Sequence, residues 1–152
     1  MIKRIYETHL EVTDVKRTIE FFEGKLGLKV GYGNETSDAV FFWVGEVGAS
    51  MLGVWKVPEG ELHGNHFAFE VDIAFLKNAK QWLNERGIQT IGSQGLTNRE
   101  PIVQAWMPAA SVYFLDPDGN KLEFIAMLDG EPLKNIPRKY YLSEWEELHK
   151  QN

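Results

Sequence analysis

The stretch S-V-Y-F-L-D-P-D-G-N-K-L-E-F, residues 111–124, decides the fold. Its D-P-D-G segment, 116–119, has turn chemistry, because proline fixes φ, glycine accepts a positive φ and aspartate can bond its own backbone. The flanks alternate with a period of two, which is typical of strands. We therefore predict a β-hairpin in which Leu122 and Phe124 share one face and Glu123, close to the turn, lies on the other.

The composition limits the class of protein. A chain of 152 residues with 43% hydrophobic and 12% aromatic residues is typical of a globular protein with a sizeable core. A net charge of -6, without a basic stripe, argues against nucleic-acid or anionic-membrane binding. The absence of cysteine excludes disulfides, thiolate metal sites and cysteine nucleophiles. With no apolar run long enough for a bilayer and no signal-peptide pattern, we expect a soluble, cytoplasmic protein.

A strand–helix–strand–strand–strand pattern occurs twice along the chain. The first copy has predicted strands at 2–13, 28–32, 40–44 and 50–57, and a helix that starts near Asp14 and ends at Gly27. The second has predicted strands at 65–71 and 88–91, residues 102–107 as a strand continuation and then the hairpin, and a helix that Asp72 caps and Gly87 ends. The segment S-E-W-E at 143–146 has a capping-box pattern, which predicts a short final helix.

The repeat predicts an α+β fold. Two βαβββ modules, residues 1–60 and 61–128, are expected to pair into a curved mixed sheet around a cleft, within one structural domain. A C-terminal tail with a short helix, 129–152, follows them. The pattern leaves open whether the modules pair within one chain or are exchanged between two chains.

The repeat also predicts which side chains face the cleft. His66 and Glu7 each lie five positions before the residue that ends the apolar face of their strand. Glu123 faces the same way if Leu122 packs beneath the helix. We expect Glu7, His66 and Glu123 to converge as a divalent-metal triad, since imidazole and carboxylate groups are common ligands. Gly53 stands at the first-half position equivalent to Glu123, which leaves coordination positions open for water or substrate.

Three motifs resemble the vicinal oxygen chelate superfamily, which includes glyoxalase I, fosfomycin-resistance thiol transferases, methylmalonyl-CoA epimerase, extradiol dioxygenases and bleomycin-resistance proteins. They are Y-F-L-D-P-D-G-N-K-L-E-F at 113–124, H-F-A-F-E-V-D at 66–72 and E-F-F-E-G-K-L-G-L at 20–28. The resemblance spans roughly residues 5–128. It implies the paired-module fold, a small-molecule substrate and a homodimer.

The resemblance also implies roles for single residues. His66 and Glu123 match the second-half metal ligands, and the first-strand ligand, usually histidine, falls on Glu7. A zinc, manganese, iron, nickel or magnesium ion is implied, without a choice among them. His9, one inward position further along, is an alternative ligand, a general base, a partner that orients a carboxylate, or a lining residue. Tyr113 matches a tyrosine that contacts substrate in the fosfomycin enzymes, so His9 and Tyr113 are the candidate catalytic residues.

Large side chains suggest a substrate wall. Trp43, Met51 and Trp55 fall on cleft-facing positions of the first-half hairpin, and Trp106 is a further candidate for substrate contact. The alternative for such residues in strands is ordinary core packing.

The function indicated is a glyoxalase-like, divalent-metal-dependent lyase or isomerase. Its substrate would chelate the ion through two vicinal oxygens, and Glu7, Glu123 or His9 would move the proton. The alternatives are a metal-free, ligand-sequestering protein of the bleomycin-resistance type, or a dioxygenase or thiol transferase of the same superfamily.

Overall fold

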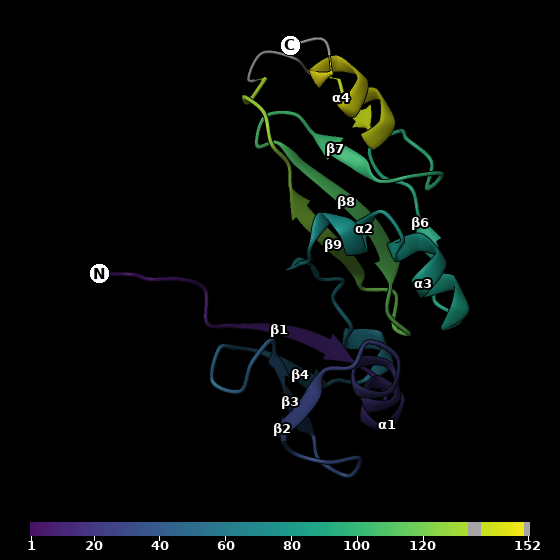
Figure 1. Ribbon diagram of the computed structural model, residues 1–152. Coiled ribbons are helices and arrows are strands. Elements are labelled where there is room, and N and C mark those ends of the chain that lie inside the picture. The colour runs from purple at the N-terminus through teal and green to yellow at the C-terminus, as the bar shows by residue number, and fades with distance from the viewer. Residues whose placement is uncertain (134–137, 151–152) are drawn as a thin grey trace. The chain divides into compact units, whose positions relative to one another are not determined.

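The computed structural model describes residues 1–133 and 138–150 and divides the chain into two compact units. The first comprises Met1–Asn65 together with Asp116–Asn120. The second comprises His66–Leu115 and the described residues from Lys121 onward. Each unit contains one mixed β-sheet with helices beside it, so the predicted α+β class is confirmed (Figure 1). Residues 134–137 and 151–152 of the predicted tail lie outside the described residues.

The first unit is a four-stranded sheet with one helical segment. Its elements are β1 (Glu7–Val12), α1 (Val15–Ile19), the π-helical η1 (Glu20–Lys25), β2 (Lys29–Tyr32), β3 (Ala39–Val44), β4 (Ser50–Lys56) and the 3-10 turn η2 (Glu59–Glu61). The strand order is β1-β4-β3-β2, with β1 parallel to β4 and the other pairs antiparallel.

The first strand is shorter than the predicted range 2–13. It begins at Glu7, opposite Met51, because β4 begins at Ser50 and offers the preceding residues no ladder. The predicted alternation is confirmed, since Leu10 and Val12 are buried while Glu7 lies on the exposed face. The helix then begins where expected, with the Asp14 side chain accepting a hydrogen bond from the Arg17 backbone N–H at 2.9 Å.

The second unit is a larger sheet with helices beside it. Its elements are β5 (His66–Glu70), α2 (Ile73–Leu76), α3 (Ala79–Glu85), β6 (Thr90–Ile91), β7 (Ile102–Gln104), β8 (Ala109–Leu115), β9 (Lys121–Met127), β10 (Tyr140–Tyr141) and α4 (Leu142–His149). The strand order is β10-β7-β8-β9-β5, and β6 pairs with β8. Leu122 and Phe124 are buried, as the hairpin pattern predicts.

The helices of the second unit depart from the prediction in two places. The predicted single helix after Asp72 is two helices with a break at Lys77 and Asn78, where Asn78 has a distorted φ of -106 and ψ of -1 and its side chain donates to the Ala74 carbonyl at 3.1 Å. The final helix begins at Leu142 rather than Ser143. Its capping contact is the Tyr141 backbone N–H, which donates to the Glu144 carboxylate at 2.8 Å.

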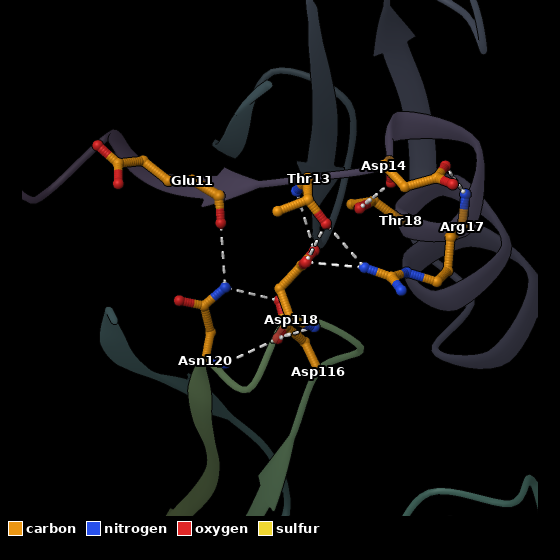
Figure 2. Close-up of polar contacts among 8 residues, drawn as sticks. All are labelled: Glu11, Thr13, Asp14, Arg17, Thr18, Asp116, Asp118 and Asn120. Atoms are coloured by element: carbon orange, nitrogen blue, oxygen red, sulfur yellow. Dashed lines mark hydrogen bonds and ion pairs between the residues drawn. The ribbon is translucent and has the colours of Figure 1, made fainter. Parts of the chain in front are cut away.

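The D-P-D-G turn of the hairpin belongs to the first unit and holds the junction between β1 and α1 (Figure 2). The Asp118 carboxylate accepts hydrogen bonds from the Thr13 hydroxyl at 2.5 Å and from the Arg17 guanidinium at 2.7 Å. Only 3% of the Asp118 side chain is exposed. The turn predicted from local chemistry therefore also carries long-range contacts.

Two further turn residues complete this polar network (Figure 2). Asp116 accepts hydrogen bonds from the backbone N–H groups of Asn120 at 2.7 Å and Asp118 at 3.0 Å. Burial nevertheless raises the pKa of the Asp116 carboxyl above its usual value. The Asn120 amide donates to the Glu11 carbonyl at 3.2 Å, which fixes the turn against β1.

Candidate metal site

His66 and Glu123 lie together on neighbouring parallel strands of the second unit. In the ladder between β5 and β9, His66 is opposite Lys121 and Glu123 is opposite Ala68. Positions two residues apart share a face of the sheet, so both side chains project from the face opposite Leu122. The His66 Nε2 atom is 3.1 Å from Glu123 Oε2. The structure therefore brings together two of the three predicted metal ligands.

The protonation of His66 makes this pair a good cation site. The other ring nitrogen, Nδ1, lies 2.8 Å from the Lys121 carbonyl oxygen, which can only accept a hydrogen bond. Nδ1 therefore carries the proton, and in neutral His66 the Nε2 lone pair faces the Glu123 carboxylate. Two acceptors at this distance require a cation between them or a second proton on the ring. A backbone carbonyl on the far nitrogen is a frequent support of histidine metal ligands.

Glu123 is held by a residue that the sequence reasoning missed. The buried Ser111 hydroxyl donates a hydrogen bond to Glu123 Oε1, while Oε2 faces His66. The Glu123 side chain is only 8% exposed. Ser111 could have been found from its position, because it lies two residues before Tyr113 on the same face of β8. The Ser111 hydroxyl thus fixes Oε1 of the Glu123 carboxylate, while Oε2 points toward the His66 imidazole.

Tyr113, predicted as a catalytic residue, lies beside the pair. It is directly opposite Glu123 in the ladder between β8 and β9, and its ring centroid is 6.3 Å from that of His66. The Tyr113 hydroxyl accepts a hydrogen bond from the Gln104 side-chain amide at 3.2 Å, and the hydroxyls of Ser111 and Ser93 are further hydrogen-bond partners. Burial, and then the Glu123 charge, raise the pKa of Tyr113 above 10.0. Tyr113 is therefore a neutral hydrogen-bond donor near neutral pH.

Glu7 and His9 form a second pair, on the sheet of the first unit. The His9 Nε2 atom is 2.7 Å from Glu7 Oε1, and both side chains are on the exposed face. The His9 ring has edge contacts with Phe41 and Trp55, at centroid distances of 5.9 and 5.8 Å. A Cβ atom on Gly53 would lie 2.7 Å from the His9 ring, so the absent side chain makes room for the imidazole.

The ladders support the predicted equivalence between the two halves. In the first unit Glu7 is opposite Met51 and His9 is opposite Gly53. In the second unit His66 is opposite Lys121, and Glu123 is again two residues further along its strand. The register therefore matches Glu7 with His66, and Gly53 with Glu123, as the repeat predicts.

The aromatic residues separate into two groups. Trp43 and Met51 are opposite each other in the ladder between β3 and β4, and Trp55 lies on the same face with 44% of its surface exposed. Phe41 belongs to this face too and was not predicted. Trp106 is 58% exposed and lies in the turn between β7 and β8, away from the strand positions that carry Tyr113.

Neither unit, over its described residues, gathers three acidic or imidazole side chains into one metal-binding group. The pairs His66–Glu123 and Glu7–His9 are the candidate ligand groups, one in each unit. Imidazole nitrogen and carboxylate oxygen together suit zinc, manganese, iron and nickel, so the donor set fits a divalent ion. The convergence of Glu7 with the second pair stays a prediction.

The fold and the paired strands define a glyoxalase-like α+β protein, and comparisons with known proteins agree. A sequence model of the Glyoxalase/Bleomycin resistance protein/Dioxygenase superfamily matches residues 4–124. The chain belongs to this superfamily. Over the described residues, none of the helices combines the length and hydrophobicity of a membrane span.

The names of individual relatives state different activities. The metallothiol transferase FosB of Staphylococcus saprophyticus is 25% identical, over 99% of this chain and 96% of that protein. A lactoylglutathione lyase of Neisseria meningitidis is 26% identical, over 84% of this chain and 94% of that protein. Among solved structures, the integron cassette protein HFX_CASS4 from the Halifax Harbour sewage metagenome has a TM-score of 0.70 at 29% identity, covering 83% of this chain and 100% of that chain.

Proposed function

We propose that the protein is a divalent-metal-dependent enzyme of the lyase or isomerase type, acting on a small substrate that binds the ion through vicinal oxygens. The observation that carries this proposal is the Nε2 atom of His66, which faces the Glu123 carboxylate at 3.1 Å while Nδ1 is committed to a carbonyl. A bound ion would act as a Lewis acid that stabilises negative charge developing on a substrate oxygen.

The remaining roles belong to residues of the chain. Ser111 orients the Glu123 carboxylate, and the Lys121 carbonyl orients the His66 ring. Tyr113 is the proposed hydrogen-bond donor to a substrate oxygen, because it is opposite Glu123 in the ladder and its ring lies beside that of His66.

We propose Glu7 as the third ligand, supported by the register that matches it with His66. His9 is hydrogen-bonded to Glu7, and we propose that it accepts a proton from the substrate or returns one to it. The wall of Trp43, Met51 and Trp55 would exclude water from the substrate. A homodimer is part of the proposal, by resemblance to the family, and sedimentation equilibrium tests it.

A second candidate function is thiol transfer. Four relatives are metallothiol transferases at 25 or 26% identity, and the match to one of them covers 99% of this chain. Gly53 also favours this candidate over strict glyoxalase I chemistry, because glyoxalase I uses a strand carboxylate at that position. Parallel assays of isomerase and thiol-addition activity with the same metal-loaded protein would separate the two.

The metal itself is tested by elemental analysis of protein purified without added ions, then loaded with zinc or manganese. We expect about one ion per chain in the native protein and a large loss in His66→Ala and Glu123→Gln. Glu70→Gln is the matched control, because Glu70 is an exposed acid on the same face of β5. If all four proteins hold less than half an equivalent, and ligand affinity survives a chelator, the metal-free binding protein replaces the enzyme.

A further inference from the structure

The C-terminal tail reaches Tyr113 through two consecutive hydrogen bonds within the second unit. The ammonium of Lys139, the residue before β10, donates to the side-chain oxygen of Gln104. The side-chain nitrogen of Gln104 donates in turn to the Tyr113 hydroxyl at 3.2 Å. Gln104 is 7% exposed and Tyr113 is 4% exposed, so the second bond is shielded from solvent. A tail residue beyond the matched range 4–124 is thereby linked to the tyrosine beside the candidate metal pair.

Lys139 fixes which end of the Gln104 amide faces Tyr113. The oxygen and nitrogen ends of a side-chain amide have nearly the same shape, so their hydrogen-bond partners decide the orientation. An ammonium group can only donate, and the Gln104 oxygen therefore faces Lys139 while the nitrogen faces Tyr113. The Tyr113 oxygen is the acceptor of that bond. With the amide turned over, Tyr113 would instead have to donate its proton to the Gln104 oxygen.

Pairing of β10 with β7 holds Lys139 in place. Tyr140, the next residue after Lys139, is opposite Val103, the residue before Gln104. Only 9% of Tyr140 is exposed, and its ring centroid is 6.3 Å from that of the buried Trp145 in α4. The backbone next to Lys139 is thus fixed by the sheet and by the final helix.

Charge pairing does not explain the position of Lys139. Over residues 1–133 and 138–150 it forms no ion pair, whereas its neighbour Arg138 is paired with the Glu144 carboxylate. A half-buried ammonium ordinarily has a carboxylate beside it, because a neutral acceptor compensates the lost hydration only in part. The bond to the Gln104 oxygen is therefore the contact for which this lysine is placed.

We propose that Lys139 is a positioning residue for Tyr113, acting through the Gln104 amide. The inference rests on the proposed function for the role of Tyr113 toward the substrate, but the two hydrogen bonds themselves need neither metal nor substrate. By holding the amide nitrogen toward Tyr113, the tail keeps the tyrosine proton from being used on Gln104. This is the condition under which Tyr113 can donate to a substrate oxygen.

The test is NMR of the metal-free protein, which reads the amide orientation directly. In the native protein the Gln104 amide protons should show nuclear Overhauser effects to the Tyr113 ring protons next to the hydroxyl. Lys139→Met should roughly halve these signals, because both orientations of the amide become possible. Lys139→Arg should restore them, since a guanidinium also only donates. Lys150→Met is the matched control, because Lys150 is an exposed lysine of the same tail that contacts Glu147.

Turnover provides a second readout in whichever assay of the metal-loaded protein shows activity. Lys139→Met should lower kcat about tenfold, as for the loss of one well-directed hydrogen bond, and leave the metal content unchanged. Gln104→Glu should have the same effect, because a carboxylate only accepts and Tyr113 must then donate to it. A native kcat in both variants would overturn the positioning role.

The two readouts keep this proposal separate from the proposed function. A protein without turnover in any assay would refute the proposed function, while the NMR signals still decide on Lys139. The proposal is overturned if the native protein lacks the signals between Gln104 and Tyr113, or if Lys139→Met keeps them as fully as Lys150→Met. The native measurement needs no variant, so misfolding of a variant does not affect it.

Discussion

Two buried carboxylates of this protein lie in contrasting surroundings. Asp118, with 3% of its side chain exposed, receives hydrogen bonds from Thr13 and an ion pair from Arg17 (Figure 2). Glu123, with 8% of its side chain exposed, receives one hydroxyl bond from Ser111, and its other oxygen faces a histidine nitrogen that has no proton in the neutral ring. The first carboxylate is fully compensated within the protein, and the second is not.

The difference separates a structural charge from a functional one. Removing one partner of a fully paired buried charge is strongly destabilising, whereas a buried charge with too few internal partners is a candidate functional group. Asp118 fixes the turn that holds β1 and α1, whereas one oxygen of Glu123 is available to the proposed ion.

Asp118→Ala should cost about 2–4 kcal/mol of unfolding free energy, because it leaves the Thr13 donors and the Arg17 charge without their acceptor. Chemical denaturation monitored by tryptophan fluorescence measures this change in unfolding free energy. The exposed Asp129 provides a control, since Asp129→Ala should change stability by less than about 0.5 kcal/mol. Equal stability of the two variants would show that the Asp118 network is not structural.

Ser111→Ala should weaken metal binding about 10–100-fold, the usual effect of removing a group that orients a ligand. The fold should stay intact, because a small side chain replaces another of similar size. Competition with a chromophoric chelator measures the affinity. Unchanged affinity would mean that the Glu123 carboxylate is positioned by something other than the Ser111 hydroxyl.

Glu123→Gln should leave the metal-free protein as stable as the native chain or more stable by about 1 kcal/mol, since a poorly compensated buried charge is removed. Zinc or manganese should raise the melting temperature of the native protein and leave that of the variant unchanged. A strongly destabilised Glu123→Gln would show that Glu123, like Asp118, has a structural role.

The smallest expected effect is on the ionisation of Tyr113. Its raised pKa has burial as the first cause and Glu123 as the second, so Glu123→Gln should lower that pKa only part of the way toward 10.0. Absorbance at alkaline pH, with Tyr113→Phe as the reference, isolates this tyrosine. If Glu123→Gln leaves the pKa of Tyr113 unchanged, the charge of the Glu123 carboxylate does not affect the ionisation of Tyr113.

The same shift has a consequence for stability. The unfolded chain ionises this tyrosine near pH 10 while the folded protein still holds the proton. The unfolding free energy contributed by Tyr113 should therefore fall as the pH rises from about 10 to the folded pKa. Tyr113→Phe should remove this part of the pH dependence.

Much of the fold could be predicted from periodicity. Alternation identified the faces of β1, β5 and β9, and the repeat predicted the equivalence of Glu7 with His66, which the ladders support. The break at Asn78 was missed, because it depends on a side chain bonding the preceding turn of helix. The start of β1 was missed because the length of its partner β4 sets it.

The site could be predicted less completely. His66 and Glu123 followed from strand register, but Ser111 and Gln104 act through contacts between strands that local sequence does not specify. Side-chain contacts that depend on the pairing of distant strands could therefore not be predicted from the sequence. The residues on one face of a single strand could be predicted, because alternation identifies them.

The most direct test of the metal site is long-range ¹H–¹⁵N NMR of the histidine rings during a zinc titration. The structure predicts that His66 starts with its proton on Nδ1 and keeps it there, while the Nε2 resonance shifts to the range of a metal-bound nitrogen as about one equivalent of zinc is added. The shift should be absent in Glu123→Gln. A His66 spectrum that does not respond to zinc, or a change at Nδ1 in place of Nε2, would contradict the account.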